Sequence, residues 1–198
     1  MRSHAVLFAL AGMLVANVAA PQEPVTLKAA LVALTDDAQV RATFEDGLAA
    51  KARERDYDAI SSYRIVPEVA DVDNRNFIRR LTAEGVGAVL MMSPAAVGAG
   101  SSLESVRDAV SPNVYSDMRR FAREISPSAG SDLFAVIHLA IYLIDEDGAE
   151  PISAGAVWLD EEAESQEQAI DLLQNLVLGN VDAVRAPIRQ HLGMPPLR

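Results

Sequence analysis

After its first twenty residues, the chain alternates between two patterns: short apolar runs, and apolar residues that recur at helical spacing. Residues 26–34 (TLKAALVAL) form a short apolar run, which predicts a buried strand. Apolar residues then recur at every fourth position, which predicts an amphipathic helix. Asp36 and Gln39 have the spacing of a capping box at the start of this helix, and Lys51 is expected on its outer face. The expected inner face consists of Val40, Phe44, Leu48 and Ala52.

The succession of strand and helix then repeats. Residues 57–66 are predicted to form a second strand, and residues 74–84 a second helix that Asp73 caps and Gly85 ends. Residues 86–92 are almost continuously apolar, as expected for a central strand that is buried on both faces. Strands that alternate with helices in this way predict a parallel β-α-β-α-β core with right-handed crossovers.

The second half of the chain predicts a β-hairpin. The apolar residues 133–144 and 152–159 flank Asp147-Gly148, a dipeptide typical of two-residue hairpin turns. Counting outward from this turn gives the expected register of the two strands. It contains the pairs Leu143–Ile152 and His138–Val157.

A second capping box, formed by Ser165 and Gln168, predicts the start of a final helix, which we expect to be interrupted near Gly179. Together the elements predict an α/β fold. It has a three-stranded β-α-β-α-β parallel core and an antiparallel hairpin in one mixed sheet, with helices packed on it. Residues 21–198 are expected to form a single domain, because their number suits one hydrophobic core.

The first twenty residues differ in character from the rest. A basic start at Arg2 is followed by residues 5–16, which carry no charge, and by small residues up to Ala20. This order is typical of a secretory signal peptide, so we expect cleavage near Pro21 and a periplasmic location. The alternative is that the segment is retained as an N-terminal anchor. The chain contains no cysteine, which excludes disulfides, thiolate chemistry and a lipid-anchor cysteine.

The charge of the chain argues against nucleic acid as a partner. Its formal net charge is −11, and so acidic a chain repels phosphate backbones. Many carboxylates gather in two groups near the hairpin, but their spacing does not match a calcium loop, and we interpret both groups as solvated. They comprise Asp145, Glu146, Asp147 and Glu150, and then Asp160, Glu161, Glu162 and Glu164.

No catalytic, metal or cofactor constellation stands out in the sequence. His138 lies in a predicted strand without a neighbouring nucleophile or carboxylate, and we interpret it as a hydrogen-bonded histidine of the sheet. The glycine-rich residues 98–102 lack the third glycine and the lysine of a phosphate-binding loop. The sequence therefore predicts no enzyme, no metal and no cofactor. An undetected hydrolase remains the alternative, because an active site can be assembled from scattered residues.

Residues 93–131 have little regular pattern, and long irregular loops commonly carry recognition. One interpretation is contact with a partner through apolar residues that no strand pattern explains: Val97, Leu103, Val114, Tyr115 and Met118. The other interpretation is that residues 115–125 form a helix covering the sheet. Its inward side chains would then be Tyr115, Met118 and Phe121.

Three short patterns mark the first half of the chain. They are Arg41…Phe44-Glu45…Leu48, Tyr57-Asp58-Ala59…Ser62-Tyr63…Pro67, and Gly85-Val86-Gly87-Ala88-Val89-Leu90. These patterns resemble those of small bacterial envelope proteins, many of them lipoproteins. The order of predicted elements is similar to that of the TolB N-terminal domain and of lipoprotein activators of cell-wall synthases. Two features depart from the resemblance: the lipid-anchor cysteine is absent, and Asp56 stands where these proteins tend to have glycine.

The resemblance implies an envelope role and offers no active-site residue. Our leading hypothesis is a non-enzymatic periplasmic domain that contacts another component of the envelope, with an envelope protein as the expected partner. The alternative is a binding protein for a small molecule or an ion that uses residues 93–131 as a lid.

Overall fold

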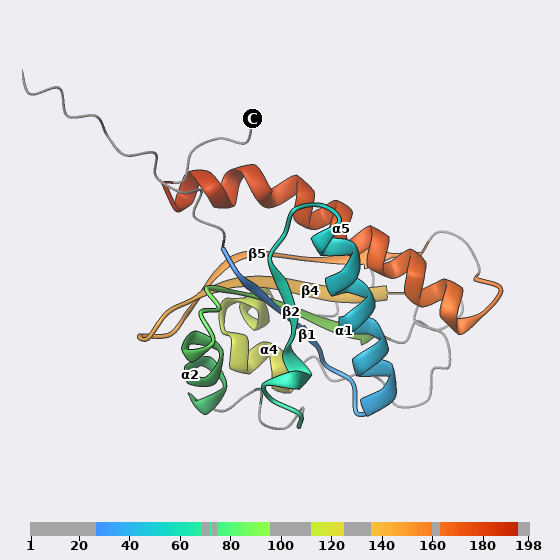
Figure 1. Cartoon of the computed structure of the whole chain (residues 1–198), viewed down its shortest axis with the longest axis horizontal. Helices are drawn as coiled ribbons and strands as arrows, with labels where there is room; N and C mark the ends of the chain where they lie inside the picture. The colour runs from blue at the N-terminus through green and yellow to red at the C-terminus, as the bar shows by residue number, and fades with distance from the viewer. Residues whose placement is uncertain are drawn as a thin grey trace, which may run out of the picture.

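The computed structural model describes residues 27–68, 72, 75–95, 112–124, 136–159 and 163–193. Five strands form one sheet in the order β2-β1-β3-β4-β5 (Figure 1). β2, β1 and β3 are parallel to one another, whereas β4 is antiparallel to both of its neighbours, β3 and β5. The expected α/β fold, a three-stranded parallel core extended by an antiparallel hairpin, is confirmed. The strands are β1 (Ala29–Ala33), β2 (Ala59–Ser61), β3 (Ala88–Ala95), β4 (Val136–Ile144) and β5 (Ala149–Trp158).

Helices cover both faces of the sheet, because successive side chains of a strand point to opposite faces and both sets are apolar. Ala30 and Val32 of β1 face one core cluster, whereas Leu31 and Ala33 face the other. Figure 1 shows α5 along one long side of the molecule and α2 and α4 across the sheet from it. The first cluster includes side chains of α2 (Arg75–Ala83), η3 (Pro112–Ser116) and α4 (Met118–Glu124). The second includes side chains of α1 (Ala38–Arg53) and α5 (Gln166–His191).

The N-cap of α1 is Asp37, one residue later than expected. Its Oδ1 atom accepts hydrogen bonds from the backbone N–H groups of Gln39 (2.8 Å) and Val40 (3.0 Å). Asp37 has the extended backbone that an N-cap requires, with φ −82° and ψ 106°. Asp36 is exposed, and the capping box predicted from it is wrong. The expected inner side chains Phe44, Leu48 and Ala52 are buried.

The strand β2 is shorter than predicted. It ends at Ser61, and the chain turns into η1 (Ser62–Arg64), so the expected strand over residues 57–66 is wrong in its second half. The cause is local: the backbone N–H of Tyr63 and the hydroxyl of Ser62 both donate to the buried carboxylate of Glu45, at 3.0 Å and 3.1 Å. These bonds draw the chain out of the sheet and toward α1.

The hairpin register also differs from the prediction. Leu143 pairs with Glu150 and His138 with Ala156, and the ladder is irregular between Ile141 and Tyr142. The turn is built on Asp145, whose Oδ1 accepts from the backbone N–H groups of residues 147 and 148, both at 2.9 Å. The positive-φ glycines of the described chain are residues 85 and 193, so Gly148 does not form the expected two-residue turn.

The helix α5 runs unbroken for 26 residues, so the predicted interruption at Gly179 is wrong. Its N-cap is Ser165 as expected, with Oγ accepting from the backbone N–H of Gln168 at 3.2 Å. Gly85 ends α2 as predicted, with a φ of +74°, and Asp56 reverses the chain after α1 with a φ of +60°. This left-handed conformation lets the chain leave α1 and α2 within a few residues.

Candidate binding pocket beneath the C-terminal helix

The floor of a pocket is formed by three alanines that lie side by side at the starts of the parallel strands. Ala29 of β1 is in register with Ala59 of β2 and with Ala88 of β3, and all three line the pocket. Adjacent strands are about 4.8 Å apart, so the row is about 10 Å across. Their small side chains leave room between the sheet and α5 that larger residues would fill.

The roof of the pocket is the second half of α5. Leu178, Val181, Ile188 and Leu192 line it, and the inner end is closed by the larger side chains of three strands. The cavity volume is about 130 Å³, close to the volume of about 150 Å³ at which an apolar cavity holds one benzene ring. The residues at the inner end are Leu31, Leu90 and Ile141.

The first half of α5 packs closely on α1, and two contacts explain why. A Cβ atom at Gly47 would collide with the side-chain amide of Gln174, so glycine lets this side chain lie close to α1. Gln174 Nε2 donates to the backbone oxygen of Phe44 at 3.1 Å. Lys51 Nζ lies 2.6 Å from Asp171 Oδ1, which corrects the expectation that Lys51 is on a free outer face.

In the described part of the chain, the second half of α5 has no helix beside it, because α1 ends at Arg53. A polar clasp holds it instead. Asp182 accepts from Arg55 at 2.6 Å and from the hydroxyl of Tyr57 at 2.5 Å. The guanidinium of Arg185 lies 4.3 Å from the centre of the Tyr57 ring. We call Arg55, Tyr57, Asp182 and Arg185 the α5 clasp.

The clasp is electrostatically self-consistent. The hydrogen bond from Tyr57 and the charge of Arg55 hold the pKa of Asp182 below its ordinary value, against the opposing effect of partial burial. Burial and the neighbouring carboxylate raise the pKa of the Tyr57 hydroxyl, which therefore stays protonated as a donor. The clasp thus fixes the height of α5 above the alanine floor at one side of the pocket.

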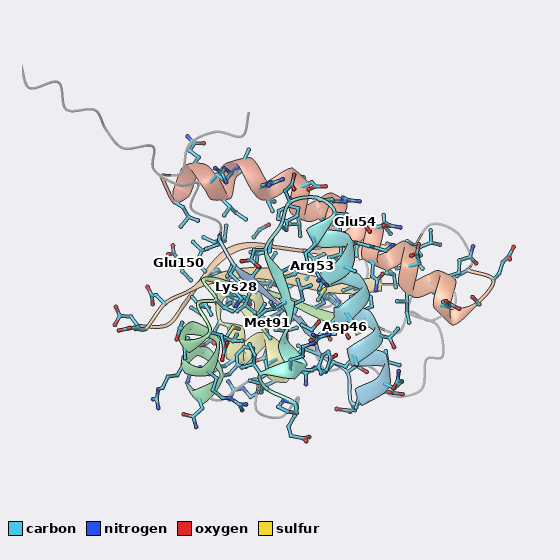
Figure 2. All side chains as sticks on the ribbon, in the orientation of Figure 1. Lys28, Asp46, Arg53, Glu54, Met91 and Glu150 are labelled. Atoms are coloured by element: carbon cyan, nitrogen blue, oxygen red, sulfur yellow. The ribbon has the colours of Figure 1, made fainter. Side chains whose placement is uncertain are left out.

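The mouth of the pocket carries charges of both signs. A neighbouring groove shares Leu27 and Leu192 with the pocket, passes Gly87 and reaches the β4–β5 turn. A Cβ atom at Gly87 would collide with Leu27, so glycine allows Leu27 to lie over the strand start. Figure 1 shows the end of α5 on the same side of the molecule as this turn, and Figure 2 labels Glu150 there. The charged residues are Asp56, Asp58, Arg185 and Arg189 around the pocket, and Asp145, Asp147 and Glu150 along the groove.

The pocket lies at the amino ends of the parallel strands, whereas open α/β sheets bind nucleotides and most substrates at the carboxyl ends. At the carboxyl ends this chain has a buried ion pair between Arg41 and Glu45 of α1, 2.9 Å apart. Arg41 also donates to the backbone oxygens of Val66 (3.0 Å) and Pro67 (2.7 Å) and to the Ser62 hydroxyl (2.9 Å). The ion pair therefore ties α1 to the chain that follows β2.

The carboxylate of Glu45 likewise accepts several hydrogen bonds. It accepts from the backbone N–H of Ala33 at 2.9 Å and of Tyr63 at 3.0 Å, besides Arg41 and Ser62. Burial raises its pKa, and the charge of Arg41 opposes that rise. Among the described residues, every buried side-chain nitrogen or oxygen has a hydrogen-bond partner. The cluster is thus a structural connection, and it presents no free group to a ligand.

His138 lies in β4, and its interpretation as a hydrogen-bonded histidine of the sheet is confirmed. Its Nδ1 atom lies 2.8 Å from the hydroxyl of Tyr115, and the hydroxyl of Tyr142 donates to the backbone oxygen of Tyr115 at 3.0 Å. Burial lowers the pKa of His138, so the ring is neutral at physiological pH. Within the described parts of the chain, no group of three or more potential metal ligands occurs.

The residues predicted to contact a partner fall into two groups: three pack in or against the core, and the others lie outside the described residues. Val114 and Met118 are buried in the core, and Tyr115 is half-buried against it. The alternative of a covering helix is confirmed in part: Met118 and Phe121 of α4 are buried, but α4 begins at Met118, and Tyr115 lies in η3. Packing against the sheet thus accounts for the apolar character of these side chains. Val97, Leu103 and residues 98–102 lie outside the described residues, so partner contact through this segment stays a prediction.

The pocket, the α5 clasp and the buried Arg41–Glu45 ion pair were not predicted from the sequence. Small residues at equivalent strand starts, Ala29, Ala59 and Ala88, are the one signal in the sequence that indicates the pocket. The interpretation of the carboxylates near the hairpin as solvated is confirmed for Asp145, Glu146 and Asp147, which are exposed.

Comparisons of the chain with protein-family models, with curated proteins and with solved structures give no match. No helix in the described residues is both long and apolar enough to cross a membrane.

Proposed function

We propose that this chain is an exported, non-enzymatic domain that holds an apolar group of another envelope component in the pocket beneath α5. The observation that carries the proposal is the row of Ala29, Ala59 and Ala88, which leaves an aliphatic cavity open at the surface next to charged groups. Binding sites are usually apolar cavities with a few polar groups at their edge. A lid formed by residues 93–131 is less well supported, because Val114 and Met118 are part of the core.

The absence of a catalytic role is supported by the state of the polar residues. Arg41 and Glu45 satisfy each other, and His138 is paired with Tyr115. The expected partner is an envelope protein, in keeping with the resemblance to envelope proteins, and the net charge of −11 disfavours nucleic acid.

The proposal can be tested by photo-cross-linking in living bacteria. A photoreactive amino acid is placed at Leu192, at the pocket mouth, or at Leu176, on the outer side of α5; their exposures are similar, 37% and 38%. We expect a specific cross-linked product from position 192 and not from position 176. The product should disappear when Ala88→Val fills the pocket. An unchanged product in that variant, at equal folded yield, would contradict the proposal.

Export is the second part of the proposal, and the order of charged, apolar and small residues in positions 1–20 supports it. Expression in a bacterial host should yield periplasmic protein whose N-terminus lies near Pro21. Mass spectrometry of the intact protein measures this directly. Recovery of the full-length chain from the cytoplasm alone would rule export by this segment out.

A further inference from the structure

The shape of the pocket beneath α5 limits what can occupy it. Its lining follows the helix from Leu178 to Leu192, a stretch about 21 Å long at 1.5 Å per residue. Its volume is nevertheless only about 130 Å³. The pocket is therefore long and narrow, and a linear chain fits it better than a ring system.

The floor of the pocket offers little to a peptide backbone. β1 and β3 are paired along both edges, so their N–H and C=O groups are already used. β2 is an edge strand, but the groups along its free edge lie in the plane of the sheet and do not point into the pocket between the sheet and α5. The roof consists of side chains of α5, whose backbone groups are bonded within the helix. Peptide groups inserted here would remain without hydrogen-bond partners, at a large free-energy cost. A hydrocarbon chain avoids that cost.

The charges at the mouth select the head group. Guanidinium groups bind phosphate through charge-assisted hydrogen bonds, whereas the neighbouring carboxylates attract an amine and repel a purely anionic head. Both kinds of group line the pocket itself, and the neighbouring groove, which shares Leu27 and Leu192 with it, carries further carboxylates. The positive groups are Arg185 and Arg189, and the negative ones are Asp56, Asp58, Asp145, Asp147 and Glu150.

We infer that the pocket beneath α5 binds a single alkyl chain of a lipid whose zwitterionic head, a phosphate with an attached amine, stays at the mouth. This inference rests on the proposed function and names the class of its ligand. The alkyl chain lies between the alanine floor and α5, the phosphate lies near Arg185 and Arg189, and the amine lies toward Asp56 and Asp58.

The test is calorimetric titration of the full mature chain with alkylphosphocholines from hexyl to dodecyl, below the concentrations at which they form micelles. We expect one molecule to bind per chain. Each added methylene should strengthen binding about fourfold until the pocket is filled, because burying a methylene contributes about 0.8 kcal/mol. Alkyl sulfates of equal chain length should bind more weakly.

Two variants separate pocket binding from adsorption on the surface. Ala88→Val adds two methyl groups to the pocket floor and should weaken binding about tenfold or more, as expected when two buried methylenes of a ligand lose their site. Ala154→Val makes the same change at an exposed position of β5 and should leave binding unchanged. Binding that is absent, independent of chain length, or equal in the Ala88→Val variant would overturn the inference.

Failure of the inference and failure of the proposed function can be told apart. If alkylphosphocholines do not bind but the cross-link from position 192 still depends on Ala88, the pocket holds an apolar group of a protein. The lipid inference is then wrong and the proposed function stands. If neither alkylphosphocholine binding nor the cross-link from position 192 depends on Ala88, both the lipid inference and the proposed function are wrong.

Discussion

Arg41 and Glu45 lie one turn apart on α1 and form an ion pair whose side chains are only 2% and 0% exposed. In a sequence, this spacing is typical of a solvent-facing pair on a helix. In the structure, the pair is surrounded by backbone groups of β1 and of the segment after η1, which it fixes in place. The ion pair lies at the carboxyl ends of the parallel strands, where open α/β sheets commonly bind ligands.

Glu45→Gln should destabilise the chain by about 3–5 kcal/mol, because removing one partner leaves a buried guanidinium without its counter-charge. Urea unfolding followed by circular dichroism measures the change. Arg41→Met should cost a comparable amount. The double variant should lose clearly less than the sum of the two, because coupling within a buried pair is not additive.

A matched control for this prediction is the pair Arg120–Glu124 of α4, which has the same spacing but side chains 40% and 45% exposed. Glu124→Gln should change the free energy of unfolding by no more than about 0.5 kcal/mol, as is typical for an exposed pair on a helix. Equal effects of Glu45→Gln and Glu124→Gln on the free energy of unfolding would contradict the burial of the Arg41–Glu45 pair.

The α5 clasp should make stability depend on pH in the acid range. The pKa of Asp182 is held below its ordinary value, mainly by the hydrogen bond from Tyr57. A carboxylate with a lowered pKa in the folded state contributes stability above its unfolded pKa of about 3.9. That contribution is lost as the pH falls through the folded pKa. Asp182→Asn should therefore lower stability by about 1 kcal/mol or less at pH 7, and the difference from the parent chain should shrink toward pH 3.

The measurement for Asp182 is a series of urea midpoints between pH 7 and pH 3. Asp147→Asn, an exposed turn residue, is the control and should show no comparable change in slope. A difference between Asp182→Asn and the parent that stays constant down to pH 3 would mean that the clasp does not depend on the ionised carboxylate.

His138 should produce a second pH dependence, near neutrality. Burial lowers its pKa in the folded state, so the unfolded chain binds the proton more readily. Stability is then full above the unfolded pKa of about 6.5 and falls as the pH drops from there to the folded pKa. Tyr115, whose hydroxyl contacts the His138 ring, has a pKa raised by burial and does not titrate in this range. Comparison of urea midpoints at pH 7.5 and 5.5 should show a smaller drop for His138→Gln than for the parent.

The fold could be predicted from sequence because its central strands β1 and β3 are buried on both faces. Residues 86–92, for example, read as one apolar run, and the alternation with helices determines a parallel core. Local features set by a single side chain were harder. The strand β2 ends early because Glu45 binds the backbone after it, and the hairpin register follows from the side chain of Asp145. Neither interaction leaves a periodic signal.

The candidate pocket was missed for a related reason. Periodicity identifies positions that are filled with large apolar side chains, whereas a cavity is defined by small ones. Ala29, Ala59 and Ala88 become informative only when the register brings them side by side. The pocket also depends on where α1 ends relative to α5, and these elements are far apart in sequence.

The inner face of α1 can be tested by truncation. Phe44 is 5% exposed and packs in the core cluster between α1, α5 and the sheet. Phe44→Ala should cost about 3–5 kcal/mol, the usual effect of emptying a large aromatic site. Thr43→Ala, at the neighbouring exposed position, should change stability by about 0.5 kcal/mol or less. Urea midpoints of the two variants decide the matter, and similar shifts would mean that the helix is rotated.

Gly179 offers a test of the continuity of α5. It lies inside the helix, it is exposed, and a Cβ atom there would meet no neighbour. Gly179→Ala should therefore raise the free energy of unfolding by about 1 kcal/mol, because alanine favours the helix and restricts the unfolded chain. Gly85 is the contrasting position: a Cβ atom there is equally free of neighbours, but its φ of +74° is unfavourable for alanine. Gly85→Ala should lower stability by about 1 kcal/mol. Urea unfolding measures both, and a loss of stability in Gly179→Ala would mean that α5 breaks there after all.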